Sequence, residues 1–266
     1  MTPENARSQS HNFPNFAAVV PAAGSGTRMK MCRRKPFLEL DGVPILFHSL
    51  ARLKAARGCR EICLAVHPND LTFCRQKLGQ MLREYFLVSA IVPGGKSRQE
   101  SVLSALEATS SSMKQVLIHD AARPLVRPLI VEEVARRTAE TGAAIAACRA
   151  IATVKEVDEK QRIVGTPDRK RLWLAHTPQG FHRDLALESH RRASPELEAT
   201  DDASLVEQMN SDVFVVEDKQ DNLKITTPED LRVGEAILAW QKSSGALARE
   251  FQMPEAAAIE SYPGSS

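Results

Sequence analysis

The amino-acid sequence predicts an α/β fold with a doubly wound, mostly parallel sheet flanked by helices. Short apolar runs of strand length alternate along the chain with segments whose apolar residues recur at helical spacing. This alternation fits repeated βαβ units, whose right-handed crossovers place helices on both faces of a parallel sheet. One break in the alternation, at residues 153–176, predicts an arm that protrudes from the sheet.

Five strands are predicted, followed or preceded by helical segments. The strands are FAAVV at 16–20, EICLAV at 61–66, LVSAIV at 87–92, QVLIHD at 115–120 and AAIAAC at 143–148. Helical spacing places Ile45, Leu46, Leu50 and Leu53 on one face of residues 44–57, and Val102, Leu103 and Leu106 on one face of residues 97–109. We expect these apolar side chains to lie in the core.

The arm and the two chain ends divide the sequence. VDEK and GTPD stand among short alternating stretches in 153–176, a pattern typical of an extended arm or hairpin. A hairpin of this size buries little surface alone, so we expect the arm, about residues 150–177, to pack against another subunit. The last helix is predicted to have Thr227 as N-cap and Pro228 as its first residue. We divide the chain into a flexible extension at 1–15, one domain at 16–243 and a loosely attached tail at 244–266.

Composition narrows the class of protein. A chain of 266 residues with 43% hydrophobic and 26% charged residues has the balance of a soluble globular protein. A net charge of +2, with both signs interleaved, does not predict binding to nucleic acid. The five cysteines lack zinc-site spacing and favour reduced thiols, with Cys63 and Cys148 expected to serve packing. No apolar run reaches the roughly 18 residues of a membrane span and the N-terminus lacks the apolar core of a signal peptide, so we expect a cytoplasmic protein with no membrane attachment.

The first predicted strand continues into a loop with two glycines, in AAVVPAAGSGTRM at 17–29. The loop does not match G-x-G-x-x-G, because Met29 stands at the third glycine position, and it does not match the Walker A pattern. Small residues after a strand still let backbone amides approach a polyphosphate at the carboxyl edge of a sheet. Alone, the loop fits a tight turn equally well.

Four further polar stretches are predicted to follow strands or precede helices. They are PGGKSRQESV at 93–102, HDAARP at 119–124, HTPQGF at 176–181 and DNLKITTPEDL at 221–231. We expect this topology to place several cations at one edge of the sheet, together with few carboxylates, chiefly Asp120. The cations are Arg28, Lys35, Arg98, Arg123, Arg169 and Lys224. This excess of positive charge predicts a ligand with several phosphates. Since no Ser-His-Asp order, carboxylate pair or H-E-x-x-H site accompanies it, phosphoryl or nucleotidyl transfer is favoured over hydrolysis.

Each of these residues also has a simpler interpretation. A single Lys or Arg on a loop is most often a solvated surface charge, and Asp120 could equally be a turn or cap residue. His119 and His176 are expected to be structural histidines with satisfied hydrogen bonds. The joint occurrence of Arg28 beside the glycine loop and Lys35 on the same connection favours the functional interpretation.

Together, these stretches resemble the motifs of one family. PAAGSGTRM, Lys35, PGGKSRQESV, HDAARP, Thr153 in ATVK, DRKRLW, HTPQGF, TDDAS and DNLKITTPEDL are similar, in order and spacing, to the motifs of the 2-C-methyl-D-erythritol 4-phosphate cytidylyltransferases, the IspD family of the non-mevalonate isoprenoid pathway. The resemblance covers about residues 17–241. It implies a Rossmann-like nucleotidyltransferase fold, a homodimer formed through the arm, and transfer of CMP from CTP to methylerythritol phosphate with release of pyrophosphate in the presence of Mg²⁺.

The resemblance also implies roles for individual residues. Ala22, Ala23, Gly24, Gly95, Ser101 and Ala121 would line the cytidine nucleotide. Arg28 and Lys35 would stabilise charge at the α-phosphate and, with Arg169 and Lys224, would form the catalytic set. Asp120, Arg123, Thr177 and Lys224 would surround methylerythritol phosphate, with Thr153 and Arg169 reaching across from the partner's arm. The metal ligands are left open.

Two departures from the family pattern stand near these residues. Lys35 lies between Arg34 and Pro36, where relatives usually have Pro-Lys-Gln, and the proline restricts the backbone of Lys35. Lys96 follows Gly95 where relatives often have an acidic residue. Two other functions are left open: a cytidylyltransferase acting on ribitol 5-phosphate, which would differ in a few hydroxyl contacts, and a non-catalytic nucleotide-binding regulatory module.

Overall fold

The computed structural model describes residues 13–24, 35–193 and 199–244. The strands of the central sheet are β1 (Phe16–Ala22), β4 (Cys59–Val66), β5 (Val88–Pro93), β6 (Gln115–Ile118), β7 (Ala143–Arg149), β10 (Trp173–His182) and β11 (Phe214–Glu217). The α-helices are α1 (Ile45–Ala55), α2 (Pro68–Phe73), α3 (Gly79–Phe86), α4 (Arg98–Glu107), α5 (Pro128–Thr141), α6 (Arg183–Arg192), α7 (Asp202–Glu207) and α8 (Pro228–Ser243). Shorter elements are η2 (Lys35–Phe37), β2 (Glu39–Leu40), β3 (Val43–Pro44), η3 (Cys74–Leu78), β8 (Glu156–Val157), β9 (Ile163–Gly165) and η4 (Arg169–Arg171).

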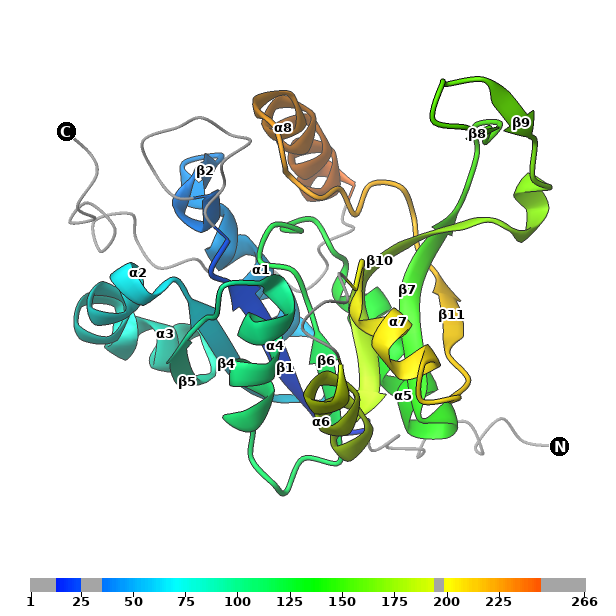
Figure 1. The fold of residues 1–266 in the computed structure, drawn as a ribbon. Coiled ribbons are helices and arrows are strands. Elements are labelled where there is room, and N and C mark those ends of the chain that lie inside the picture. The colour runs from blue at the N-terminus through cyan, green and yellow to red at the C-terminus, as the bar shows by residue number, and fades with distance from the viewer. Residues whose placement is uncertain (1–12, 25–34, 194–198, 245–266) are drawn as a thin grey trace, which may run out of the picture.

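These elements form a twisted sheet with helices on both faces (Figure 1). In the described part of the chain the central sheet has seven strands, in the order β11-β7-β10-β6-β1-β4-β5. Its neighbouring strands are parallel except where β10 pairs with β6 and β7. The predicted α/β class with a mostly parallel sheet is confirmed, and all five predicted strands are present as β1, β4, β5, β6 and β7.

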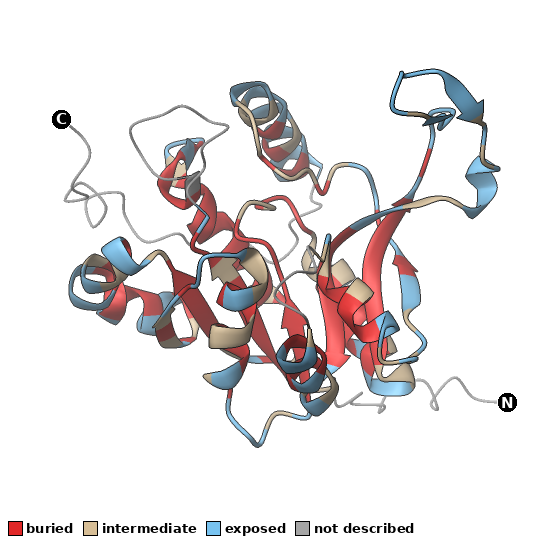
Figure 2. Ribbon diagram, viewed as in Figure 1, coloured by how far each residue is buried: buried red, intermediate tan, exposed pale blue. Residues whose placement is uncertain are grey.

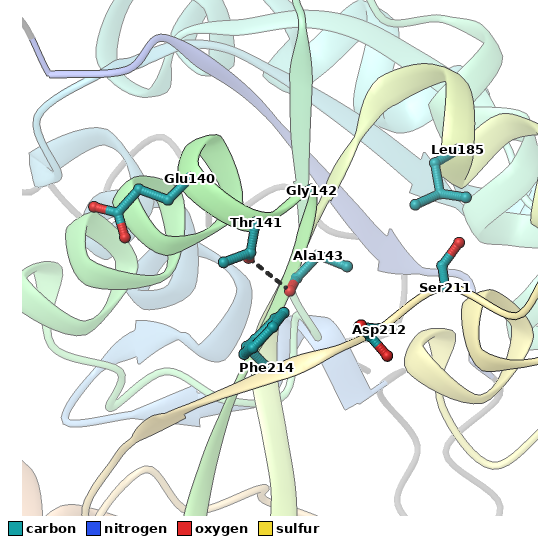
Figure 3. Close-up of a pocket in the computed structure, with 8 residues that line it drawn as sticks. All are labelled: Glu140, Thr141, Gly142, Ala143, Leu185, Ser211, Asp212 and Phe214. Carbon is teal, nitrogen blue, oxygen red and sulfur yellow. Dashed lines mark hydrogen bonds between the residues drawn. The ribbon is translucent and has the colours of Figure 1, made fainter.

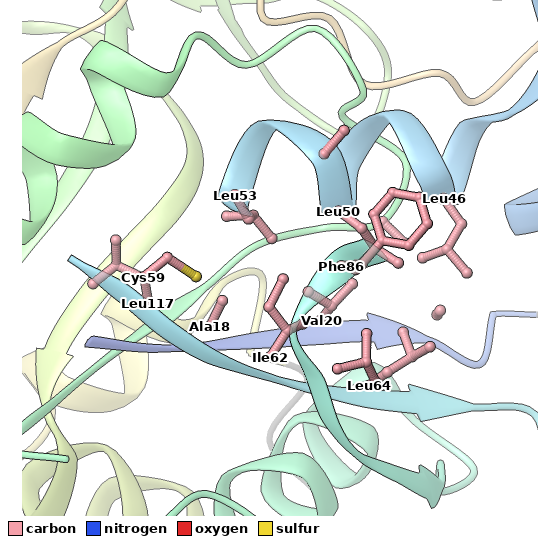
Figure 4. Packing of buried hydrophobic residues seen from close by; sticks show 14 of the residues in the cluster. Ala18, Val20, Leu46, Leu50, Leu53, Cys59, Ile62, Leu64, Phe86 and Leu117 are labelled. Atoms are coloured by element: carbon pink, nitrogen blue, oxygen red, sulfur yellow. The ribbon is translucent and has the colours of Figure 1, made fainter. Parts of the chain in front are cut away.

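Two clusters of buried apolar side chains lie one on each face of the sheet, and a smaller third cluster includes Leu40 of β2 and Leu238 of α8. Helices α1, α3 and α5 pack on one face, and α4, α6 and α7 pack on the other. Figure 4 shows Leu46, Leu50 and Leu53 of α1 packed toward Ala18 of β1 and Ile62 of β4. Full burial of one such leucine contributes roughly 2 kcal/mol. The predicted apolar face of this helix is therefore what attaches α1 to the sheet.

Two strands of the sheet, β10 and β11, were not predicted from the sequence. The first residues of β10 fall in the segment predicted to be the arm, and its last residues are buried between β6 and β7. Gly180 in β10 lies so close to α5 that a Cβ atom there would stand 2.3 Å from Thr138 Oγ1. The backbone of β10 is hydrogen-bonded to strands on both sides, so β10 can be buried without a continuous apolar run. For this reason the apolar pattern of the sequence did not predict it.

The arm leaves the body where β7 ends and β10 begins, and it carries the β8–β9 hairpin (Figure 1). The backbone N–H of Ala150 donates to the oxygen of Leu172, 3.1 Å away, which continues the β7–β10 pairing beyond the sheet. Figure 2 shows the arm as the most extended exposed part of the described chain. The exposed large apolar residues of this region are Ile151, Val154, Val157, Ile163, Val164 and Leu174.

The ends of the described chain are tied to the body. The guanidinium of Arg57 lies 3.7 Å from the ring centroid of Phe13, and Arg60 Nε donates to Asn15 Oδ1 at 2.7 Å.

Thr227 caps α8 and forms a capping box with Asp230, which confirms the predicted start of this helix. Residues 1–12 of the predicted extension and 245–266 of the predicted tail lie outside the described residues. No helix in the described ranges is long and apolar enough to span a membrane.

Candidate functional site

Two loops of small residues meet at the carboxyl ends of β1 and β5. Ala22 ends β1, and Ala23 and Gly24 follow it. Gly94 follows β5, and a Cβ atom there would stand 2.3 Å from the Cβ of Ala23 and 2.8 Å from the hydroxyl of Ser101. The backbone after β5 can pass this close to Ala23 only because residue 94 is glycine. The structure thus brings Ala23 and Ser101 of the predicted nucleotide set together.

The turn before α4 is held by its own side chains. Ser97 caps α4 by accepting a hydrogen bond from Glu100 N at 3.0 Å. Ser101 Oγ accepts one from Gly95 N at 3.1 Å and donates to Ser97 O at 2.9 Å, and Glu100 Oε2 accepts one from Lys96 N at 2.9 Å. The amides of Gly95 and Lys96 are therefore engaged within the turn. The turn is thereby ordered by its own side chains before any ligand binds.

Asp120 lies at the centre of the predicted substrate set. It follows β6, and its carboxylate lies between two cations, with Oδ1 2.9 Å from Arg98 Nε and Oδ2 2.7 Å from Lys224 Nζ. Its backbone N–H donates to Thr177 Oγ1 at 3.1 Å. The carbonyl of the next residue, Ala121, accepts a hydrogen bond from Ser49 of α1 at 2.9 Å, which fixes this loop on the helix. Chain segments more than fifty residues apart thus meet at Asp120.

The charges around Asp120 are balanced more closely than the sequence indicates. Burial alone would raise the pKa of Asp120, but the positive charges of Arg98 and Lys224 outweigh it and hold this pKa well below its usual range. Arg98 also makes two hydrogen bonds to Asp202, at 2.9 and 2.7 Å. Burial opposes the charge on Arg98, yet Asp202 and Asp120 together raise its pKa. Arg98 is therefore neutralised by two carboxylates, of which the sequence analysis named only Asp120.

Arg123 and His119 complete this part of the site. Arg123 donates from Nη1 to Asn222 O at 2.7 Å, and burial lowers its pKa. His119 Nε2 lies 3.1 Å from Arg123 O, so Nε2 carries the proton, and Nδ1 accepts a hydrogen bond from the Thr177 hydroxyl at 3.1 Å. Burial lowers the pKa of His119 to about 4. His119 is thus a neutral structural histidine, as predicted.

Two predicted site residues, Thr153 and Arg169, lie on the arm, which protrudes from the sheet (Figure 1). Thr153 is exposed, and exposed Arg169 in η4 donates from Nη1 to Ile151 O at 2.8 Å. Arg28 lies outside the described residues, and Lys35 is the first residue of η2. The described residues therefore assemble Asp120, Arg123, Thr177 and Lys224, and leave the arm residues separate.

Sequence reasoning missed three buried polar residues beside this site: Asp202, Asp218 and Asn222. Asp202 and Asn222 belong to the quoted stretches TDDAS and DNLKITTPEDL, so a signal for them was present. Asp218 lies in no motif, and only the fold reveals that it accepts hydrogen bonds from His176 at 3.1 Å and Asn222 at 2.7 Å.

A pocket of about 500 Å³ lies elsewhere, where α5 ends and β7 begins (Figure 3). Gly142 and Ala143 line it together with Phe214 of β11, and the Thr141 hydroxyl donates to Ala143 O at 3.1 Å. The predicted site residues follow the carboxyl ends of their strands, whereas this pocket lies at the amino ends of β7 and β11. It is separate from the cluster around Asp120.

Relatives with established names match nearly all of the domain. The chain is 42% identical over 226 residues to a 2-C-methyl-D-erythritol 4-phosphate cytidylyltransferase of Syntrophus aciditrophicus, covering 85% of this chain and 96% of that protein. It is 36% identical over 231 residues to the protein of the same name from Bacillus licheniformis, covering 86% of this chain and 97% of that protein.

Solved structures and a family model agree with these relatives. The crystal structure of 4-diphosphocytidyl-2C-methyl-D-erythritol synthase from Anaerococcus prevotii has a TM-score of 0.73 and 28% identity, and covers 85% of this chain and 99% of that chain. The cytidylyltransferase structure from Thermus thermophilus has a TM-score of 0.68 and 31% identity, with 85% and 99% covered. The model of the family IspD, 2-C-methyl-D-erythritol 4-phosphate cytidylyltransferase, matches residues 16–240. The chain therefore belongs to the IspD family of cytidylyltransferases.

Proposed function

We propose that this protein transfers CMP from CTP to 2-C-methyl-D-erythritol 4-phosphate, giving 4-diphosphocytidyl-2-C-methyl-D-erythritol and pyrophosphate. Membership of the IspD family supports the reaction. The observation that carries the proposal is the position of Asp120, a buried, ionised carboxylate between Arg98 and Lys224 beside the loops of small residues. A carboxylate accepts hydrogen bonds from the hydroxyl groups of a polyol, and a lysine pairs with its phosphate.

The nucleotide is proposed to lie along the loops after β1, β5 and β6. The residues assigned to it are Ala22, Ala23, Gly24, Gly95, Ser101 and Ala121. Small side chains on these loops leave the backbone accessible to a base and a ribose. The buried contact between Gly94 and Ala23 supports one continuous surface for both loops.

The proposed reaction joins two anions. A phosphate oxygen of methylerythritol phosphate attacks the α-phosphorus of CTP, the bond to the bridging oxygen breaks, and pyrophosphate leaves with the electron pair. Charge repulsion must be offset before the oxygen can approach, and we assign this task to the catalytic set Arg28, Lys35, Lys224 and Arg169 of the partner's arm. Asp120, Arg123 and Thr177, with Thr153 from the arm, would orient the acceptor.

Magnesium is proposed to enter with the nucleotide. In the described part of the chain, no group of three or more His, Cys, Asp or Glu side chains could hold a metal ion. Both oxygens of Asp120 already face cations. The residues therefore fit an ion bound mainly through the triphosphate, as is usual for Mg²⁺, where it would offset phosphate charge.

We also propose a cytoplasmic homodimer formed through the arm. The apolar side chains Ile163 and Val164 are exposed on the arm, and a second subunit would cover such side chains. A dimer would also let Arg169 reach a site that it does not reach in its own chain. Free thiols at Cys59, Cys63 and other described positions support a reducing compartment.

The test of the proposed function is pyrophosphate release from CTP and Mg²⁺ with methylerythritol 4-phosphate, and separately with ribitol 5-phosphate. We expect turnover with methylerythritol 4-phosphate alone. Turnover only with ribitol 5-phosphate would assign the protein to the other polyol. Absence of turnover with both acceptors, in a folded protein that binds CTP, would favour the regulatory module.

A further inference from the structure

Asp218 is a buried carboxylate at the end of β11, outside the residues assigned to substrate. Its backbone N–H donates to Ala147 O at 2.8 Å, which fixes it against β7. Oδ1 accepts a hydrogen bond from Lys219 N at 2.7 Å, and Oδ2 accepts from His176 Nδ1 at 3.1 Å and from Asn222 Nδ2 at 2.7 Å. Burial opposes ionisation, but hydrogen bonds from His176 and Asn222 outweigh it and lower the pKa of Asp218.

Asn222 links this carboxylate to the proposed acceptor site. Its Nδ2 also donates to Thr177 O at 2.9 Å, and its backbone oxygen accepts the hydrogen bond from Arg123 Nη1 at 2.7 Å. Both contacts are buried or partly buried. Asn222 thus contacts Asp218 and Thr177 through its side chain and Arg123 through its backbone oxygen, and both Thr177 and Arg123 are assigned to methylerythritol phosphate.

The other partner of Asp218, His176, lies next to a thiol. His176 Nε2 is 3.5 Å from Cys148 Sγ, so the three groups stand in the order thiol, imidazole and carboxylate. This order also occurs around nucleophilic cysteines. Here Cys148 is only 3% exposed and burial raises the pKa of its thiol, whereas nucleophilic cysteines have accessible thiols of lowered pKa.

We infer that Asp218 is a positioning residue for the acceptor site: through Asn222 it holds Arg123 and Thr177 in the arrangement that binds the phosphorylated polyol. This inference rests on the proposed function. Asp218 is not among the residues assigned to either substrate, and the loops assigned to CTP share no hydrogen bond with it among the described residues.

The experiment is D218N, which keeps the size of the side chain. An amide has one acceptor oxygen in place of two, so its NH₂ group must face either Lys219 N–H or the donors of His176 and Asn222. We expect KM for methylerythritol 4-phosphate to rise at least tenfold, while KM for CTP stays within twofold. A neighbouring change, E217Q, is the matched control because Glu217 makes an exposed ion pair with Arg149 at 3.1 Å, and it should behave like the unmodified protein.

Each outcome has a distinct meaning. An unmodified protein inactive with both acceptors contradicts the proposed function itself, whereas an active protein whose D218N variant keeps its KM for methylerythritol 4-phosphate overturns only this inference. An equal rise of both KM values indicates a general structural role and also overturns it. If D218N does not fold, N222S is tested instead, because it removes the Asn222 side-chain amide and keeps the backbone oxygen. N222S should raise KM for methylerythritol 4-phosphate and leave KM for CTP unchanged. If it does not, the inference is overturned.

Discussion

Asp120 is the single residue on which most of the described site depends. Asp120→Asn removes the charge that holds Lys224 at 2.7 Å and Arg98 at 2.9 Å. We expect kcat/KM for the acceptor to fall about a hundredfold or more, equivalent to roughly 3 kcal/mol, because a proposed catalytic cation loses its anchor. Steady-state kinetics with varied methylerythritol 4-phosphate measures the effect, and circular dichroism verifies folding.

The control for this change is Asp41→Asn, which breaks the exposed pair of Asp41 and Lys242. Exposed pairs contribute little, so this variant should retain its kinetics. A kcat/KM within twofold of the unmodified value in Asp120→Asn would remove Asp120 from the site.

Two buried histidines make the stability of the fold dependent on pH. Burial lowers the pKa of His48 and of His119 to about 4, below the unfolded value of about 6.5. The unfolded chain therefore takes up protons first, and stability is lost as the pH falls from 6.5 toward 4. Between pH 7 and pH 5 we expect each histidine to reduce the free energy of unfolding by about 2 kcal/mol.

Urea unfolding of His48→Gln at both pH values measures this contribution. Glutamine can still donate to Leu40 O, which lies 2.8 Å from His48 Nε2. The variant should lose about 2 kcal/mol less than the unmodified protein between pH 7 and pH 5. His182→Gln, at an exposed position, is the control; an equal loss in all three proteins would contradict the assignment.

At the residue scale, the sequence predicted which residues belong to the site more successfully than it predicted which of them pair with one another. Asp120 and Lys224 lie together, as the motifs imply. Arg98 was counted in an excess of positive charge, because the sequence does not show that it pairs with Asp202, 104 residues away, through two hydrogen bonds. Pairings of this kind depend on how α7 packs beside α4, and this packing cannot be predicted from the sequence near either residue.

At the scale of elements, α8 shows how a local signal fixes the start of a helix. Thr227 Oγ1 accepts a hydrogen bond from Asp230 N at 3.2 Å, and Asp230 Oδ2 accepts from Thr227 N at 2.9 Å. Thr227→Ala removes half of this capping box, so we expect the free energy of unfolding to fall by about 1 kcal/mol. Chemical denaturation of Thr227→Ala and of Thr227→Ser measures it. The serine variant keeps the hydroxyl and should match the unmodified protein; equal losses in both would argue against the cap.

Strands with continuous apolar runs were predicted well, and β10 was not. Val19 and Leu64 belong to the continuous apolar runs of β1 and β4, and such runs are typical of buried parallel strands. The inner part of β10 contains Thr177, Gln179 and Gly180, which are buried because neighbouring strands and α5 surround them. Burial imposed by neighbours leaves no pattern in the strand itself.

For the whole molecule, the proposed dimer can be tested by combining two inactive variants. Arg169→Ala changes the arm and Lys224→Ala changes the body, so each homodimer has two defective sites. If Arg169 acts in the partner's site, mixing and subunit exchange create heterodimers in which one site carries both changes and the other carries none. At equal amounts half of the dimers are mixed, and about a quarter of full activity should return.

Pyrophosphate release before and after exchange gives this measurement, with each variant exchanged against itself as control. No recovery, although mass spectrometry detects heterodimers, would mean that Arg169 serves its own chain or neither chain.

The continuity of β7 and β10 from the sheet into the arm has a consequence for how this architecture can diversify. Gly180 pairs with Ala144 inside the body and Trp173 pairs with Arg149 at the base of the arm, so the same two strands serve both regions, with a shift of register between Ala175 and Gln179. Adding two residues to each strand would lengthen the arm and preserve which side chains face each side, whereas adding one to a single strand would exchange the sides beyond it. Evolution can therefore adjust the reach of the arm in steps of two residues while the strand segment that carries Thr177 stays unchanged.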